Sequence, residues 1–205
     1  MSEIVNGILP KTDAVDILVG YFFFSGYHLL SQGLSDKKLR ILVGLDVDTN
    51  ISKSIQVINN LSSNTLTLGQ LREQYYQQFV YLFNNSDFLD SDDKQKSFTL
   101  FYNKIKDGSL EIRKTEEPCH AKMYIFDFGS DFNENGEDPG NVITGSSNLS
   151  YQGLEGRVEI NARFKDKQHH IDAKSIFEEL WLSAVPVIDT DTIPEWEEKV
   201  INHIW

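Results

Sequence analysis

The residues with the clearest chemical potential are a histidine and a lysine two positions apart, His120 and Lys122, followed by Asp127. Alternate residues of a β-strand point to the same face of a sheet, so the imidazole and the ammonium are predicted to lie side by side. Eighteen residues after Asp127 comes Gly145-Ser-Ser-Asn148, a turn that offers a hydroxyl, a side-chain amide and backbone N–H groups. Together these groups suit a phosphate with a nucleophile beside it.

Each of these side chains has a role in the hydrolysis of a phosphodiester. A neutral imidazole at His120 can attack phosphorus and form a phosphohistidine, which divides the reaction into two easier steps. Lys122 and Asn148 are expected to bind non-bridging oxygens and to stabilise the charge of the five-coordinate transition state. Ser146 adds a hydroxyl donor, and Gly145 allows a close approach of the backbone. The sequence therefore predicts a catalytic site that binds phosphate.

The elements that must position these residues begin with a strand–helix–strand pattern. Apolar, β-branched and aromatic residues predict strands at 15–24 and 38–45, with a short helix at 27–33 between them. This order with short links is typical of a parallel βαβ unit. Further strands are predicted at 110–113, 120–128, 141–145 and 157–164, and helices at 170–182 and 194–205.

The segment 50–107 lacks strand signals and carries helical periodicity at 51–61, 66–83 and 92–106. The chain has 205 residues, a length that suits one domain with a full hydrophobic core. We therefore expect a single α/β domain over 1–205, in which helices flank a mixed β-sheet and about 50–107 form a helical insertion.

Composition and charge limit the classes of function. The net charge of −12 argues against simple nucleic-acid binding, although basic residues gather in 113–122 and 157–174 and leave a local basic patch open. The single cysteine, Cys119, excludes an internal disulfide and fits a reducing cytoplasm. No apolar run approaches the roughly 18 residues that span a bilayer, so no membrane partner is expected.

The motifs resemble those of the phospholipase D superfamily, whose HxKxxxxD pattern is matched by His120, Lys122 and Asp127. The GSSN turn and Glu159, eleven residues after Asn148, extend the match. The flanking segments VDILVGYFFFSG and LRILVGLDVD resemble the phospholipase D-like domain that precedes Swi/Snf-type helicase domains in bacterial proteins, and single-motif nucleases. The resemblance implies a nuclease without metal or cofactor, in which Glu159 accepts a hydrogen bond from the second ring nitrogen of His120.

The chain has only one such motif, so one His120 does not supply both the nucleophile and the general acid and base. A second group must protonate the leaving oxygen and then activate water. The remaining histidines, His28, His169, His170 and His203, lack the pattern. A twofold homodimer that shares one site between two copies of His120 is the economical solution. The resemblance further implies DNA as a partner, and the chain end at Trp205, which has no capping signal, suggests an N-terminal fragment with C-terminal helicase domains.

Other residues near the motif are expected to be structural. Asp127 lies five positions beyond Lys122, so strand alternation places it on the opposite face. The same alternation turns Cys119 away from the site. Asn161 shares a face with Glu159 and is an open candidate for supporting it. The adjacent His169 and His170 are expected to lie in solvent at the start of a helix.

Three other functions remain open from the sequence. The first is a non-catalytic module that binds DNA or nucleotides, or that dimerises, and retains the site. The second is a lipid phosphodiesterase, which needs an apolar access surface. The third is a domain that binds a nucleotide or cyclic dinucleotide. Measurement of activity separates the first from a nuclease.

Overall fold

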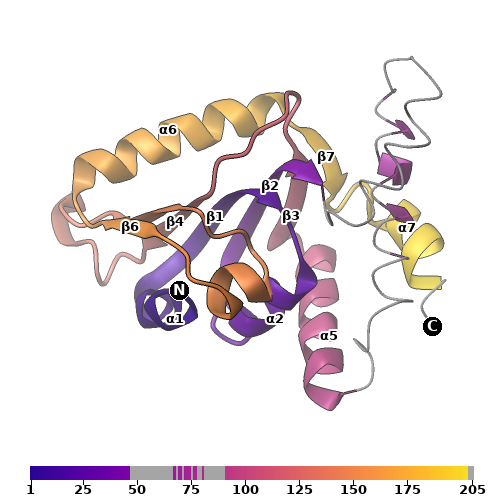
Figure 1. Ribbon diagram of the computed structural model, residues 1–205, viewed down its shortest axis with the longest axis horizontal. Coiled ribbons are helices and arrows are strands. Elements are labelled where there is room, and N and C mark those ends of the chain that lie inside the picture. Colours follow the sequence, from indigo (N-terminus) through magenta and orange to yellow (C-terminus); the bar gives the residue numbers. More distant parts are fainter. Residues whose placement is uncertain are drawn as a thin grey trace.

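The computed structural model describes residues 1–46 and 91–202, and between them residues 67, 69, 70, 72–74, 76, 77 and 80. The helix predicted at 51–61, and half of the residues of the one predicted at 66–83, lie outside the described residues. Within the described part, seven strands form one sheet in the order β6-β5-β4-β1-β2-β3-β7 (Figure 1). The strands are β1 (Thr12–Tyr21), β2 (Lys38–Asp46), β3 (Leu110–Lys114), β4 (Met123–Phe128), β5 (Gly140–Gly145), β6 (Asn161–Phe164) and β7 (Val185–Ile188).

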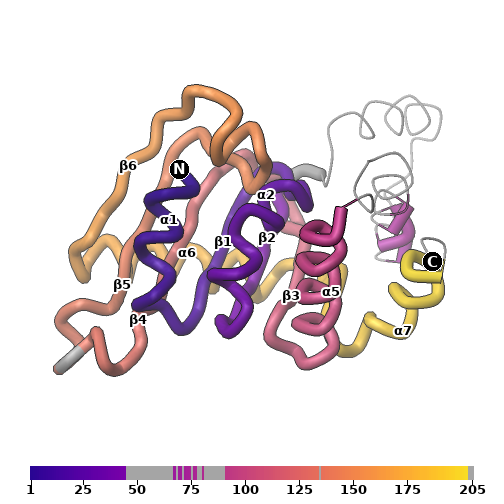
Figure 2. The backbone as a smooth tube through the Cα atoms, turned by 90° about the horizontal axis from the view of Figure 1, so that it is seen from below, coloured from indigo at the N-terminus to yellow at the C-terminus, as the bar shows by residue number. Residues whose placement is uncertain are grey.

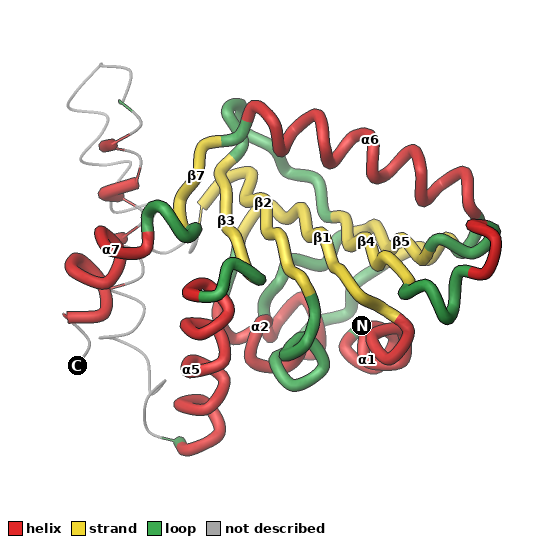
Figure 3. Tube along the Cα trace, turned by 180° about the vertical axis from the view of Figure 1, so that it is seen from behind, coloured by secondary structure: helices red, strands yellow, loops and turns green. Residues whose placement is uncertain are grey.

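The sheet is mixed, as the sequence predicted. β1 and β2 pair in parallel, as do β2 and β3, whereas β4, β5, β6 and β7 join their neighbours antiparallel. The crossover from β1 to β2 contains α2 (Phe24–Leu30), so the predicted βαβ unit is confirmed. Figure 3 shows from behind that β7 lies at one edge and that β3, β2, β1, β4 and β5 follow it in this order.

Helices cover the two faces of the sheet unequally. α6 (Lys167–Ser183) runs alone across one face, while α1 (Ser2–Ile8), α2 and α5 (Asp92–Lys106) lie on the other (Figures 1 and 2). Side chains therefore separate into two clusters according to strand alternation. In β1, Ile17 and Val19 join the larger cluster with α2 and α5, whereas Leu18 joins the smaller cluster beneath α6.

Several predicted boundaries were wrong by a few residues. β1 ends at Tyr21 because the chain then turns into α2, so Phe24, the last residue of the predicted strand, belongs to the helix. β4 begins at Met123 and β6 at Asn161, three and four residues later than predicted. The residues before β6 include Val158 and Ile160, which are 100% and 83% exposed at the sheet edge. The predicted helix 92–106 is confirmed as α5.

The buried side of α6 is not simply its most apolar side. Ile171 and Ile176 are about half exposed, while His170 and Ala173 are buried together with Phe177. The buried stripe includes His170 because its imidazole contacts Asp127 of β4. The remaining elements are the short helix α7 (Ile193–Trp196) and the turns η1 (Leu9–Lys11), η3 (Glu134–Gly136), η4 (Gln152–Gly156) and η5 (Glu197–Ile201).

Residues 203–205 of the predicted C-terminal helix lie outside the described residues. No helix in the described part is long and apolar enough to cross a membrane.

Candidate active site

The predicted site residues meet at one end of the sheet, where β4 begins and β5 ends. The antiparallel pairing of β4 and β5 places Met123 opposite Thr144. The segment before β4, with His120 and Lys122, therefore lies beside the GSSN turn that follows β5. The end of β1 adjoins both, because Phe22 bridges Leu149 just after the turn.

His120 and Lys122 contact each other directly. The Nζ atom of Lys122 lies 2.6 Å from Nδ1 of His120 and donates to the His120 carbonyl oxygen at 2.8 Å. A protonated lysine only donates, so Nδ1 of His120 must accept and the ring proton must sit on Nε2. The two side chains were predicted to be neighbours on a strand; they are neighbours just before it. Any substrate phosphate that attracts Lys122 frees the Nδ1 lone pair.

The Lys122 ammonium is held in an unusual environment for a charge. The residue is 7% exposed, and burial lowers the pKa of Lys122 from its ordinary value, while the negative charge of Glu159 acts against this shift. A poorly solvated cation at the mouth of a site binds an anion more strongly than a cation in water does. His120, in contrast, is exposed and open to a ligand.

Gly44 of β2 fixes the segment that carries His120. The Cys119 N–H donates to the Gly44 carbonyl oxygen at 3.0 Å, and a Cβ added to Gly44 would lie 1.8 Å from the Cys119 carbonyl oxygen. Only glycine allows this close approach of two backbones. Cys119 packs against the smaller hydrophobic cluster while His120 faces outward, so the predicted orientation of Cys119 is confirmed.

The GSSN turn is held from three sides. Ser147 is fully buried; its carbonyl oxygen accepts from the Tyr124 hydroxyl at 3.0 Å, and its Oγ accepts from Asn161 Nδ2 at 2.8 Å. Oδ1 of Asn148 accepts from the Tyr21 N–H at 3.1 Å, which leaves the amide N–H groups of Asn148 to donate elsewhere. Asn161 thus supports the turn rather than a substrate.

Gly145 makes the close approach that the sequence predicted. A Cβ at this position would lie 2.2 Å from the Ile160 carbonyl oxygen. The contact brings the segment before β6 against the turn, and the Ser146 N–H donates to the same Ile160 oxygen at 3.1 Å. Glu159 therefore enters the site beside Ser146.

The partner of Glu159 differs from the one implied by the resemblance. Ser146 Oγ donates to the Glu159 carboxylate, and in the described part of the chain Glu159 makes no hydrogen bond to His120. Glu159 instead contacts the site through Ser146 and through its electrostatic effect on Lys122. The structure thus joins His120 with Lys122 and Ser146 with Glu159, as two adjacent pairs.

Asp127 lies on the face beneath α6, away from His120, as predicted. His170 Nε2 lies 2.9 Å from Asp127 Oδ1, and Lys174 donates to Asp127 Oδ2 at 2.7 Å. Burial raises the pKa of Asp127, but these hydrogen bonds outweigh it, and the pKa is lowered overall. The expectation that His170 is solvated was wrong, because it is 6% exposed and binds this carboxylate; His169 is exposed.

Two contributors to the site were not identified from the sequence. Tyr21 orients Asn148 through its backbone and meets the His120 ring edge-on, with ring centroids 6.2 Å apart. Gly44 was not singled out at all. The aromatic run 21–24 carried a signal for Tyr21, since a strand that ends at a site exposes its last residues; Tyr21 and Phe23 are half-buried, whereas Phe22 and Phe24 are buried.

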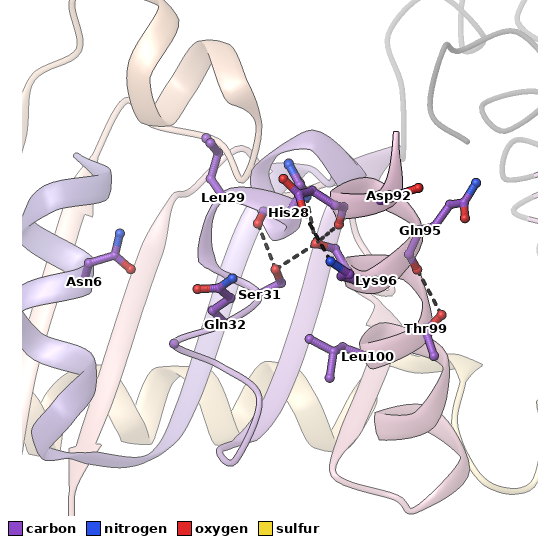
Figure 4. A pocket seen from close by; sticks show the side chains of 13 residues that line it. Asn6, His28, Leu29, Ser31, Gln32, Asp92, Gln95, Lys96, Thr99 and Leu100 are labelled. Carbon is purple, nitrogen blue, oxygen red and sulfur yellow. Dashed lines mark hydrogen bonds and ion pairs between the residues drawn. The ribbon is translucent and has the colours of Figure 1, made fainter. Parts of the chain in front are cut away.

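A larger cavity lies away from these residues, between α2 and α5 on the helical face (Figure 4). Its volume is about 1020 Å³, and the side chains around it include His28, whose Nδ1 lies 2.8 Å from Ser97 Oγ. None of the predicted site residues lines it. The predicted site residues therefore lie outside this cavity despite its size.

The comparisons with known proteins agree with the motif. Residues 14–181 match the protein family described as "Cardiolipin synthase, PLD-like domain". The chain therefore belongs to the phospholipase D-like family. A search of the curated proteins finds no match.

Two solved structures resemble the chain at low identity. Nuc from Salmonella typhimurium, a phospholipase D family member, is 12% identical, with a TM-score of 0.47 over 90% of this chain and 88% of that chain. NucT from Helicobacter pylori is also 12% identical, with a TM-score of 0.45 over 90% of this chain and 91% of that chain.

Proposed function

We propose that this domain is a metal-independent phosphodiesterase that cleaves DNA through a phosphohistidine on His120, in a site shared by two copies of the chain. The observation that carries the proposal is the exposed imidazole of His120, which lies 2.6 Å from a buried lysine beside the Asn148 amide. This set supplies a nucleophile and two donors for phosphate oxygens without a cation. Membership of the phospholipase D-like family supports the class of reaction.

The first step uses the lone pair on His120. The ammonium of Lys122 moves from Nδ1 to a non-bridging oxygen of the phosphate, and the freed imidazole attacks phosphorus. As the N–P bond forms, the P–O bond to the leaving oxygen breaks, and a general acid gives that oxygen a proton. Lys122 and the Asn148 amide stabilise the negative charge that grows on the equatorial oxygens. Glu159, held by Ser146, keeps negative charge close to Lys122 and so favours its protonated form.

Protonation of the leaving oxygen in the first step, and activation of water in the second, need a general acid and base that one copy does not supply. Of the described histidines, His28 lies on α2, and His169 and His170 lie at the start of α6, so none of the three adjoins His120. A second copy of His120 across a twofold axis fills both roles. The solvent-exposed side chains of Val158 and Ile160, on either side of Glu159, offer an apolar surface to that second copy.

Hydrolysis of labelled DNA in the presence of EDTA tests the proposal. Wild-type protein is expected to cleave, and His120→Ala is expected to lose at least about a thousandfold in rate because the nucleophile is absent. Circular dichroism and light scattering on both proteins confirm that fold and oligomeric state are unchanged. A fully active His120→Ala protein would refute the mechanism.

Mixing experiments test the shared site. Wild-type and His120→Ala chains are unfolded and refolded together in equal amounts. If two copies of His120 serve one site, the specific activity falls to about a quarter of the wild-type value, whereas independent sites give about a half. A monomer in light scattering that is nevertheless fully active contradicts the shared site.

One observation favours a second function, a binding module that retains the site. Lys122 occupies Nδ1 of His120, and Glu159 is bonded to Ser146 and not to the imidazole, so neither contact prepares His120 for attack. A folded dimer that binds DNA tightly but does not cleave it identifies this function. In either case we propose a cytoplasmic protein whose domain acts together with C-terminal helicase domains.

A further inference from the structure

A second polar cavity, of about 410 Å³, lies at the far end of β5 and β6 from His120. It is formed by the end of α1 and the turn η1, the loop before β5, and the link from β6 to α6; Figure 2 shows α1 beside β5. Its charged side chains are Lys11, Glu137, Asp138, Arg163, Lys165, Asp166 and Lys167.

The positive charges of this cavity exceed what its carboxylates neutralise. Lys167 pairs with Glu137 at 3.4 Å, and Asp166 is engaged by His169 at 2.7 Å. Within the described residues, Lys11, Arg163 and Lys165 form no ion pair, and the four lysine and arginine side chains of the lining outnumber its three carboxylates. In a chain with a net charge of −12, this is a local excess of positive charge.

Arg163 is oriented without being neutralised. Its Nε atom donates to Oδ1 of Asn141 at 2.6 Å, and the amide carries no charge to offset the guanidinium. The two terminal nitrogens of Arg163 stay available, and a guanidinium donates to phosphate in a paired geometry. The cavity is therefore suited to a phosphate group.

The cavity and the candidate active site lie at opposite ends of β5 and β6. Within β6, strand alternation places Arg163 on the same face of the sheet as Asn161, which supports the GSSN turn. Asn141, which holds Arg163, lies four residues before Gly145, a distance of about 13 Å along β5. Phosphates along one strand of a duplex advance by about 3.4 Å each along the axis, so at most about four nucleotides span 13 Å.

We propose that this cavity is a distal phosphate subsite, in which Lys11, Arg163 and Lys165 bind the backbone of a nucleic-acid strand whose scissile phosphate lies at His120. The subsite rests on the proposed function and defines its substrate as a polymer with many phosphates. A small diester with one phosphate occupies the site at His120 and leaves the distal subsite empty.

The test is the double variant Arg163→Gln/Lys165→Gln, in which glutamine retains a donor for Asn141. The substrates are a labelled 20-nucleotide single strand and bis-(p-nitrophenyl) phosphate. The variant is expected to lose about tenfold in kcat/KM on the oligonucleotide and nothing on the small diester. The slope of log affinity against log salt is expected to become shallower by about 1.4, from two lost contacts at about 0.7 each.

Lys96→Gln/Lys106→Gln is the matched control, because it removes two exposed lysine charges from α5 on another part of the surface. This control is expected to behave as wild type on both substrates. An unchanged rate on the oligonucleotide in the Arg163→Gln/Lys165→Gln variant overturns the subsite, as does an equal loss on both substrates.

Binding separates failure of the subsite from failure of the proposed function. Fluorescence anisotropy with the same 20-nucleotide strand is measured on His120→Ala protein with and without the double substitution. Weaker binding in the doubly substituted protein supports the subsite even if the wild type cleaves nothing. Equal affinity, or no binding by either protein, overturns it.

Discussion

Charged side chains beneath α6 are paired with opposite charges, whereas Lys122 on the other face of the sheet contacts a histidine. Beneath α6, Asp16 is 2% exposed and accepts from Arg40 at 2.7 Å through two guanidinium nitrogens, while Lys174 bonds both Asp16 and Asp127. Arg40 also reaches Glu178 at 2.5 Å. In this network each charge has an oppositely charged partner.

At the other face, the charge of Lys122 faces an imidazole. Asn148 accepts one backbone N–H and keeps its amide donors free of partners in the described residues. The comparison teaches that one motif serves two purposes. Asp127 binds α6 to β4 through His170 and Lys174. His120 and Lys122 contact each other and no oppositely charged side chain in the described residues.

Among the variants that compare the two faces, the largest effect is expected when Lys122 of the candidate site is replaced by methionine. Lys122→Met should lower kcat by about a hundredfold to a thousandfold, because one donor to the transition state is lost. Its Tm should change little, since an apolar side chain suits a buried position. Steady-state kinetics and thermal melting check both expectations. A fall in Tm with kcat retained would reverse the comparison.

The same exchange on the other face should act on stability. Lys174→Met leaves Asp16 with Arg40 alone and Asp127 with His170 alone, so we expect a loss of about 2 kcal/mol in the free energy of unfolding. The estimate is reduced because the Lys174 side chain is 26% exposed. Urea denaturation measures it, and kcat of the remaining folded protein should stay near wild type. Loss of kcat at unchanged stability would argue that the network serves catalysis.

Gly44→Ala should disturb the site through the backbone. The added methyl meets the Cys119 carbonyl oxygen, so the segment with His120 must shift, at a cost of about 1–3 kcal/mol. We expect a loss of about tenfold or more in kcat. Gly69→Ala is the matched control, because nothing lies within 4 Å of its added Cβ. Wild-type kinetics for Gly44→Ala would show that the close approach is dispensable.

The smallest effect is a change in acid stability. The pKa of Asp127 in the folded protein is lowered from 3.8, so its contribution to stability is present above that value and is lost as pH falls through the lowered pKa. Asp127→Asn removes this contribution. Between pH 5 and about 3, Tm of the wild type should therefore fall a few degrees more steeply than that of the variant. Parallel Tm curves would separate Asp127 from acid stability.

The sequence by itself determined the parallel βαβ unit and the span of α5. It also predicted His120, Lys122, Gly145 and Asn148 as site residues. Hydrophobic periodicity and motif spacing can be read from residues close together in the chain, and the βαβ unit and α5 follow from such patterns. The position of Asp127 on the face of the sheet opposite to Lys122 also followed from a local pattern, the alternation of side chains along a strand.

Only the tertiary structure decided which partners these side chains have. Glu159 bonds Ser146, and His170 is buried against Asp127, because segments far apart in the chain meet there. The role of Gly44 depends on a backbone 75 residues away in sequence at Cys119. Spacing along the chain carries no information about such contacts, since they depend on how strands and helices pack in three dimensions.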